Sequence, residues 1–235
     1  MKEHRLNKQV KQRILKPGGR INLGCFRIEF FPVCHSIPDS VGLIIRTPIG
    51  IVVHSGDYKL DYTPVDMRTT DLSRIAEVGK EGVFLLLSDS TYAELPGYTP
   101  SEKTVGNALD QIIGEATGRV IITTFSSLIA RVQQIADATA KHDRKLAIIG
   151  RSLKDTVRIA TETGYLKIPQ ELLIRLDEIR SISPSKVVLL TTGSQGEPTS
   201  ALVRIANKEN NDVHIIPGDT IVMSATPVPG NEHLV

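Results

Sequence analysis

Cysteine is nearly absent from this sequence of 235 residues, with only Cys25 and Cys34 and no Cys-x-x-Cys pair. This scarcity excludes a disulfide framework and a zinc site built from thiolates. Two free thiols are typical of a protein in a reducing compartment, so we expect a cytoplasmic protein.

Long apolar runs are also lacking, because no run approaches the roughly 18 residues that a membrane helix needs. The basic start leads into no apolar segment, which argues against a signal peptide. We therefore expect no membrane partner. The net charge of +2 is nearly balanced, so whole-chain charge neither favours nor excludes nucleic acid. Tryptophan is absent and aromatic residues make up 4% of the chain, which leaves little material for stacking surfaces.

The sequence does contain strands that alternate with amphipathic helices. We expect strands at 20–33, 41–46, 51–54, 83–87, 119–124, 145–149, 186–191, 213–216 and 220–223. We expect helices at 99–117 and 128–136, from 152, after 169, and at 198–206. The apolar run 83–87 predicts a fully buried strand. This alternation predicts an α/β fold with a mostly parallel sheet covered on both faces, and a domain boundary near 96–99.

Polar clusters follow three of the expected strands, and they contain His35, Asp57 and Asp89. A hydrolytic two-metal site needs imidazoles and carboxylates, and one carboxylate can bridge both ions. His35 can supply a nitrogen and Asp57 a bridging oxygen, because Gly56 allows a tight bend before it. Taken singly, each residue fits a plainer role: a strand-end histidine, a Ser-Gly-Asp turn, and an aspartate that caps the following turn. His54, within a strand end, fits a structural role.

Several blocks, taken in order, resemble the ribonuclease J branch of the metallo-β-lactamase nucleases that carry a β-CASP insertion. The blocks are His35–Ser40, Thr47–Gly50, His54–Lys59, Thr63–Asp66, Ser88–Glu94, Pro96–Glu102, Phe125–Ser127, Arg131–Gln134, Gly150–Ser152, Thr192–Pro198 and Pro227–Glu232. The resemblance covers about residues 18–235. It implies part of a metallo-β-lactamase αββα sandwich at 1–97, without its N-terminal half. It also implies a nearly complete α/β β-CASP domain with a mainly parallel sheet at 98–235.

The resemblance also implies residue roles. His35 and Asp57 match metal ligands for two zinc ions, and Asp57 and Asp89 match catalytic residues. RNA contacts are expected from loops of the second part, where backbone groups should dominate because aromatics are scarce. The residues expected to bind RNA are Phe125, Ser126, Ser127, Arg151, Ser152, Gly193, Gln195 and Glu197.

Two family motifs are not found in the sequence: no His-x-His-x-Asp-His cluster precedes His35, and no Ser-Gly-His motif follows the last block. We therefore expect a fragment that is inactive alone. The complete protein is expected to be a zinc-dependent ribonuclease, both 5′-to-3′ exonuclease and endonuclease, in rRNA processing and mRNA decay. Its expected substrate is single-stranded RNA with a 5′-monophosphate, and its expected state is a homodimer or homotetramer.

Three alternatives stay open. The chain alone could be a non-catalytic RNA-binding or association module, because two ligands hold zinc poorly. A related β-CASP nuclease could act on DNA or on pre-mRNA ends. A nucleotide-binding α/β domain is disfavoured, because the sequence contains neither a Gly-x-Gly-x-x-Gly nor a Gly-x-x-x-x-Gly-Lys-[Ser/Thr] loop.

Overall fold

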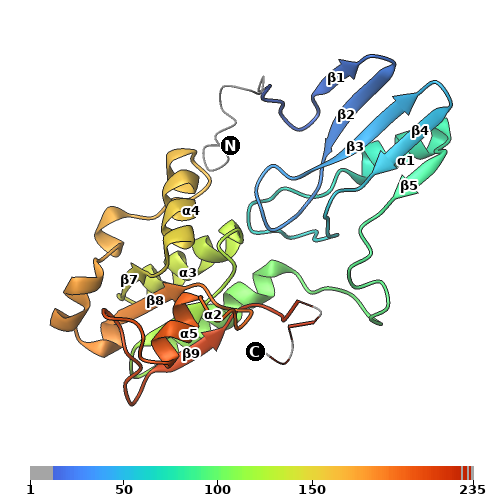
Figure 1. Ribbon diagram of the computed structural model, residues 1–235. Helices are drawn as coiled ribbons and strands as arrows, with labels where there is room; N and C mark the ends of the chain where they lie inside the picture. The colour runs from blue at the N-terminus through green and yellow to red at the C-terminus, as the bar shows by residue number, and fades with distance from the viewer. Residues whose placement is uncertain (1–12, 229, 232, 234–235) are drawn as a thin grey trace. The chain divides into compact units, whose positions relative to one another are not determined.

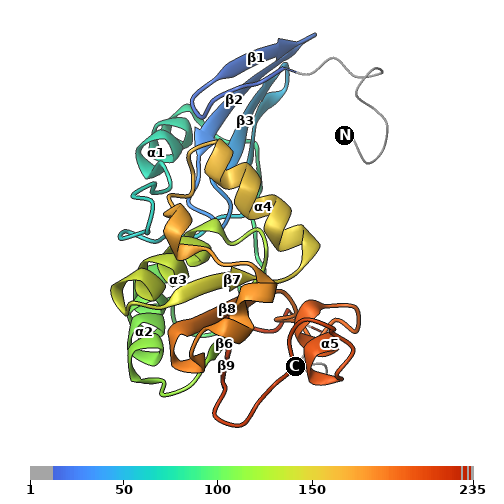
Figure 2. The ribbon, with the colours of Figure 1, turned by 90° about the vertical axis from the view of Figure 1, so that its left-hand side faces the viewer.

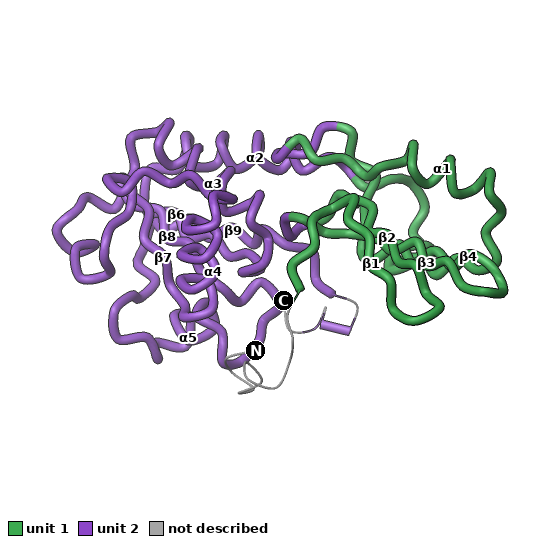
Figure 3. Tube along the Cα trace, turned by 90° about the horizontal axis from the view of Figure 1, so that it is seen from above, with its two compact units in different colours: residues 1–35, 39–62, 67–99 green, residues 36–38, 63–66, 100–235 purple. Residues whose placement is uncertain are grey.

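The computed structural model describes residues 13–228, 230–231 and 233, so Pro229 and Glu232 of the last block lie outside the described residues. The described chain forms two compact units, coloured separately in Figure 3. The first takes in the residues up to His35 together with 39–62 and 67–99. The second takes in 36–38, 63–66 and the residues from Pro100 onward. The assignment of two domains to 1–97 and 98–235 stays a prediction.

The first unit contains a five-stranded sheet in the order β1-β2-β3-β4-β5, shown in Figure 1. Its strands are β1 (Arg20–Leu23), β2 (Phe26–Pro32), β3 (Val41–Thr47), β4 (Gly50–His54) and β5 (Leu85–Leu87). Neighbours from β1 to β4 are antiparallel, whereas β4 and β5 are parallel. The predicted strand at 20–33 is therefore a hairpin with a turn at Gly24. The strands predicted at 41–46 and 51–54 are confirmed, and they form a hairpin.

Helix α1 (Leu72–Glu81) connects β4 to β5 and supplies buried Val78 to the core of this unit. Its N-terminus is capped by the Asp71 carboxylate, which accepts the Arg74 amide at 2.9 Å. Phe31 lies opposite Gly42 in the β2–β3 register. A Cβ atom at Gly42 would lie 2.2 Å from the Phe31 ring, so only glycine leaves room for the ring there.

The prediction of a fully buried strand at 83–87 is wrong. The side chains of Leu85, Leu86 and Leu87 are between 44% and 61% exposed, and Phe84 is 67% exposed. The physical reason is position: β5 is the last strand of the sheet and pairs only with β4. Within the described residues, nothing buries the two faces of this edge strand, although its sequence has the apolar character of a central one.

The second unit contains a four-stranded, fully parallel sheet in the order β7-β8-β6-β9. Its strands are β6 (Val120–Thr123), β7 (Lys145–Ile148), β8 (Val187–Thr191) and β9 (Thr220–Met223). Its helices are α2 (Glu102–Glu115), α3 (Ile129–Lys141), α4 (Arg151–Glu162) and α5 (Ala201–Ala206), with short 3₁₀ turns at Gln170–Leu172, Leu176–Ser181 and Pro184–Lys186. The predicted α/β class with a mainly parallel sheet is confirmed.

Successive residues of the central strands point to opposite faces, and each face has its own core. Ile122 and Leu190 pack in the cluster that includes residues of α2, α3 and α4. Ile121 and Leu189 pack in the cluster that includes residues of α5. Figure 2 shows α2 and α3 on one side of this sheet and α5 on the other. Both faces are covered, which explains why β6 and β8 are apolar at every position or nearly so.

Local details differ from the prediction. Residues 213–216 do not form a strand, because only Val213 of this segment is buried while Ile215 and Ile216 are exposed. Helix α2 begins at Glu102 and not at 99, and its N-cap is Ser101, whose hydroxyl accepts the Lys103 amide. No helix among the described residues has the length and apolarity to cross a membrane.

Candidate functional site

The loops after β2 and β4, which carry His35 and Asp57, meet through main-chain contacts. The Lys59 amide donates to the Cys34 carbonyl at 2.9 Å. The hydroxyl of buried Thr70 accepts the Cys34 amide and donates to the Lys59 carbonyl, both at 2.9 Å. His35, which directly follows Cys34, is half-buried at this junction.

Ser55 joins the loop after β4 to the loop after β5. Its buried hydroxyl accepts the Asp89 amide at 2.9 Å and donates to the Gly56 carbonyl at 2.6 Å, while its own amide donates to the Leu87 carbonyl. Sequence reasoning gave Ser55 no role, although a serine hydroxyl can both donate and accept a hydrogen bond and can therefore join two loops. The three predicted residues of this unit therefore follow β2, β4 and β5 at the same edge of one sheet, with β3 between the first two strands.

The Asp89 carboxylate is held in its ionised form by several donors. Its Oδ1 accepts the Thr91 hydroxyl at 2.7 Å and the Thr91 amide at 3.0 Å, and its Oδ2 accepts the Tyr58 amide at 3.4 Å. The Thr91 hydroxyl is the largest cause that lowers the pKa of Asp89, followed by the Thr91 amide; the Tyr58 amide and the charge of nearby His35 add to it. Asp89 thus caps its own turn and also faces the His35 loop.

The Asp57 side chain is exposed and follows a bend that requires glycine. Gly56 has φ +64°, and a Cβ there would lie 2.7 Å from the Val41 carbonyl oxygen. The Gly56 amide donates to Nδ1 of His54 at 3.0 Å, which gives His54 a structural role in the bend. Within the described residues the Asp57 carboxylate makes no hydrogen bond or ion pair, so its oxygens are available to an external ligand.

These donors fit zinc in kind but not in number. Imidazole nitrogen and carboxylate oxygen are ordinary zinc ligands. However, the described residues contain no group of three histidine, cysteine or acidic side chains that could hold a metal ion. His35 and Asp57 therefore do not form a complete metal site among the residues described.

The second set of predicted residues lies at the carboxyl edge of the parallel sheet in the second unit. Phe125, Ser126 and Ser127 follow β6, Arg151 and Ser152 follow β7, and Gly193, Gln195 and Glu197 follow β8. The Ser152 hydroxyl donates to the Ser126 hydroxyl at 3.2 Å, which joins two of these loops. In layered α/β folds this edge is where ligands usually bind.

Gln195 is used inside the protein. Its side chain is buried, its Nε2 donates to the Thr226 carbonyl at 3.1 Å, and its Oε1 accepts the Val228 amide at 2.6 Å. This places the loop after β8 against the segment after β9. Its direct contact with RNA stays a prediction, because both ends of its amide are already engaged.

Arg151 differs, because it is exposed at the first position of α4 and makes no ion pair with the described residues.

Sequence reasoning missed Arg131, which is buried and joins this edge to α2 by donating to the Ser224 hydroxyl at 2.5 Å and to Glu102 at 2.7 Å. It also missed the hydroxyls of Thr123 and Thr124, which are buried at the end of β6 without a partner among the described residues. A buried polar side chain within an apolar helical face was the available signal for Arg131.

The fold and these two strand-edge clusters define a mixed α/β protein with polar sites at sheet edges. A crystal structure of a protein of unknown function from Enterococcus faecalis V583 has the same fold, with a TM-score of 0.55 and 18% identity over 77% of this chain and 45% of that chain. Residues 117–235 match the family model described as ribonuclease J, beta-CASP domain. The chain belongs to the ribonuclease J family, as the resemblance predicted.

Curated relatives support this membership along nearly the whole chain. It is 47% identical to a ribonuclease J of Thermus thermophilus over 94% of this chain and 39% of the relative. It is 44% identical to ribonuclease J of Synechocystis sp. (strain PCC 6803) over 98% of this chain and 36% of the relative. It is 40% identical to ribonuclease J2 of Bacillus subtilis (strain 168) over 99% and 42%. The chain spans about two fifths of the length of these relatives.

Proposed function

We propose that this chain is part of a ribonuclease that hydrolyses phosphodiester bonds in RNA, both from the 5′ end and internally. One observation carries the proposal: His35, Asp57 and Asp89 follow β2, β4 and β5 at one edge of the same sheet, and hydrogen bonds tie their loops together. The Lys59 amide joins the His35 and Asp57 loops, and Ser55 and Tyr58 join the Asp57 and Asp89 loops. Membership in the ribonuclease J family supports RNA over DNA as the substrate, and it favours this branch over the related nucleases that act on pre-mRNA ends.

The cofactor we propose for the complete protein is zinc, two ions, with His35 and Asp57 among the ligands. The donor types support this, whereas the number of donors in the described residues requires further ligands from elsewhere. When bound, two zinc ions supply an activated hydroxide and offset charge on phosphate oxygens. Asp89, kept ionised by Thr91, orients the loop beside His35 and can accept a proton.

The RNA contacts we propose lie at the carboxyl edge of the parallel sheet. Arg151 is suited to a phosphate because its guanidinium is exposed and unpaired among the described residues, at the N-terminus of α4. Phe125 offers the ring of the loop after β6 for a base. The substrate we propose is single-stranded RNA with a 5′-monophosphate. We also propose a cytoplasmic location, a role in rRNA processing and mRNA decay, and a homodimer or homotetramer.

The test compares two alanine variants of the full-length protein. Asp57→Ala is expected to abolish release of labelled products from 5′-monophosphorylated RNA while the circular dichroism spectrum stays unchanged. Asp212→Ala removes an exposed carboxylate far along the sequence and is the matched control, expected to keep full activity. A wild-type rate for Asp57→Ala would overturn the metal assignment, and faster cleavage of a matched DNA strand would overturn the substrate.

A second candidate function is favoured by the lack of a three-ligand group among the described residues. In this reading the 235 residues alone bind RNA, or associate with another chain, without cutting it. Elemental analysis after dialysis is expected to find negligible zinc in the isolated chain, and labelled RNA is expected to stay intact. Stoichiometric zinc would contradict this second reading and support the first.

A further inference from the structure

A cavity of about 400 Å³ lies in the second unit, beside the carboxyl end of β7, and none of the predicted RNA-binding residues lines it. Its apolar surface comes from Ile148, Leu173, Ile174 and Leu176. Leu173 pairs with Leu146 as an isolated parallel bridge, so the segment that follows continues the sheet beyond β7. The cavity is within the range of roughly 300–1,000 Å³ that is typical of small-ligand sites.

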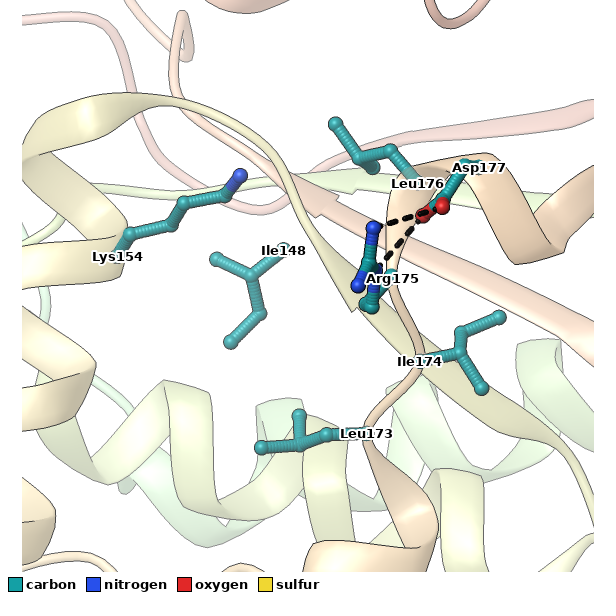
Figure 4. Close-up of a pocket in the computed structure, with 7 residues that line it drawn as sticks. All are labelled: Ile148, Lys154, Leu173, Ile174, Arg175, Leu176 and Asp177. Atoms are coloured by element: carbon teal, nitrogen blue, oxygen red, sulfur yellow. Dashed lines mark hydrogen bonds and ion pairs between the residues drawn. The ribbon is translucent and has the colours of Figure 1, made fainter.

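Charged side chains flank this apolar surface, as Figure 4 shows, with Ile148 between Lys154 and Arg175. Arg175 donates to both carboxylate oxygens of Asp177, at 3.0 and 2.8 Å. This two-point contact fixes the plane of the guanidinium and raises the pKa of Arg175. Because Asp177 occupies the edge of the guanidinium, its face stays available, and such a face stacks well on a nucleobase.

Lys154 supplies the positive charge that a phosphate requires, because the charge of Arg175 is already paired with Asp177. Its ammonium is exposed and makes no hydrogen bond or ion pair with the described residues. It lies on α4 three residues after Arg151, so the two side chains share one face of the helix. The next cation along that helix, Arg158, is paired with Glu162 and Asp155. The unpaired cations of α4 are therefore Arg151, in the predicted RNA-binding loop, and Lys154, at the cavity.

We propose that this cavity is an accessory subsite for one nucleotide of single-stranded RNA. This rests on the proposed function, because it extends the RNA path beyond Arg151. The base contacts the apolar surface and the Arg175 guanidinium, and its phosphate lies at Lys154. A hydrophobic side chain of a protein partner would fill the apolar surface but would leave the Lys154 charge without a purpose.

Binding of labelled single-stranded RNA to the 235-residue chain, followed by fluorescence anisotropy over a salt series, tests the subsite. Lys154→Gln is expected to weaken binding about fivefold at about 0.1 M salt and to lower the salt slope by about 0.7, the value for one phosphate contact on a single strand. Leu173→Ser is expected to weaken binding about fivefold without changing the slope, since a stacked base contributes at least about that much. A merely structural role would not separate the two slopes.

Two matched controls isolate the site. Lys186→Gln removes another exposed lysine, which directly precedes the amino end of β8, and Ile159→Ser removes an exposed apolar side chain of α4 outside the cavity. Both are expected to bind RNA as the wild type does. RNA that carries 4-thiouridine is further expected to crosslink to the peptide that contains Leu173 and Arg175.

The outcomes separate this inference from the proposed function. If the wild type binds RNA and the Lys154 and Leu173 variants bind equally well, the subsite is wrong while the proposed function stands. If the wild type does not bind RNA, the subsite falls and the RNA-binding part of the proposed function falls with it. If these variants change only the oligomeric state in light scattering, the cavity is a protein contact and the subsite is overturned.

Discussion

Removing one partner of the ion pair between Arg119 and Asp219 should destabilise the second unit more than removing one partner of a surface pair. The two side chains are 7% and 1% exposed, and the guanidinium donates to the carboxylate at 3.0 and 2.6 Å. Asp219 also accepts the Ile216 amide at 2.9 Å. Asp219→Ala leaves the buried Arg119 charge with only the His214 carbonyl, so we expect a loss of about 3–5 kcal/mol in the free energy of unfolding.

Urea denaturation followed by far-ultraviolet circular dichroism measures this loss. Asp219→Asn keeps a neutral acceptor and is expected to cost about 2 kcal/mol, between the wild type and the alanine variant. Asp212→Ala removes an exposed carboxylate from the same segment and is expected to change stability by less than about 0.5 kcal/mol. A loss below about 1 kcal/mol for Asp219→Ala would show that this pair behaves like a solvated surface pair, and would refute the reasoning.

Thr91→Val is expected to raise the pKa of Asp89, because the Thr91 hydroxyl is the largest cause of its lowering; a carboxyl resonance that titrates as in the wild type would contradict this. Since the folded pKa lies below the unfolded value of about 3.9, Asp89 contributes stability above about pH 4 that is lost as the pH falls through the folded pKa, and the variant should show less of this loss. Gly42→Ala is expected to destabilise the first unit by about 1–3 kcal/mol in urea, because its Cβ would overlap the Phe31 ring. Combining it with Phe31→Leu should recover part of this lost stability. Additive losses in the double variant would exclude the clash. Gln195→Ala is expected to cost about 1–3 kcal/mol by removing the two hydrogen bonds to the Thr226 carbonyl and the Val228 amide, and hydrogen exchange should rise at the Val228 amide but not in β7.

The sequence predicted the elements of the second unit well, because their signals are local. The apolar positions Val132, Ile135 and Ala136 recur at helical spacing, and all three are buried on α3. The exposure of 83–87 was not predictable in this way, because an apolar run does not reveal whether a strand is central or at an edge. That depends on what else pairs with it, which is a property of the whole sheet.

The candidate site was only partly accessible to the same reasoning. The strand-end positions of Asp57 and Asp89 follow from the pattern of apolar runs, and the resemblance supplied their roles. The linking function of Ser55 and the internal use of the Gln195 amide could not be predicted, because both depend on hydrogen bonds between segments distant in sequence. The unpaired Lys154 escaped notice because a lone lysine on a helix carries no motif.

The strand order of the second sheet has a consequence for how the polypeptide folds during synthesis. Val120 of β6 pairs with Val188 on one side and with Thr220 on the other, whereas the β1–β4 hairpins pair residues that are close in sequence. Such distant pairings slow folding, because closing a long loop costs conformational entropy before the strand contacts that offset this cost can form. A ribosome therefore releases β6 well before either neighbour exists, and this apolar strand must wait unpaired until most of the second unit has emerged.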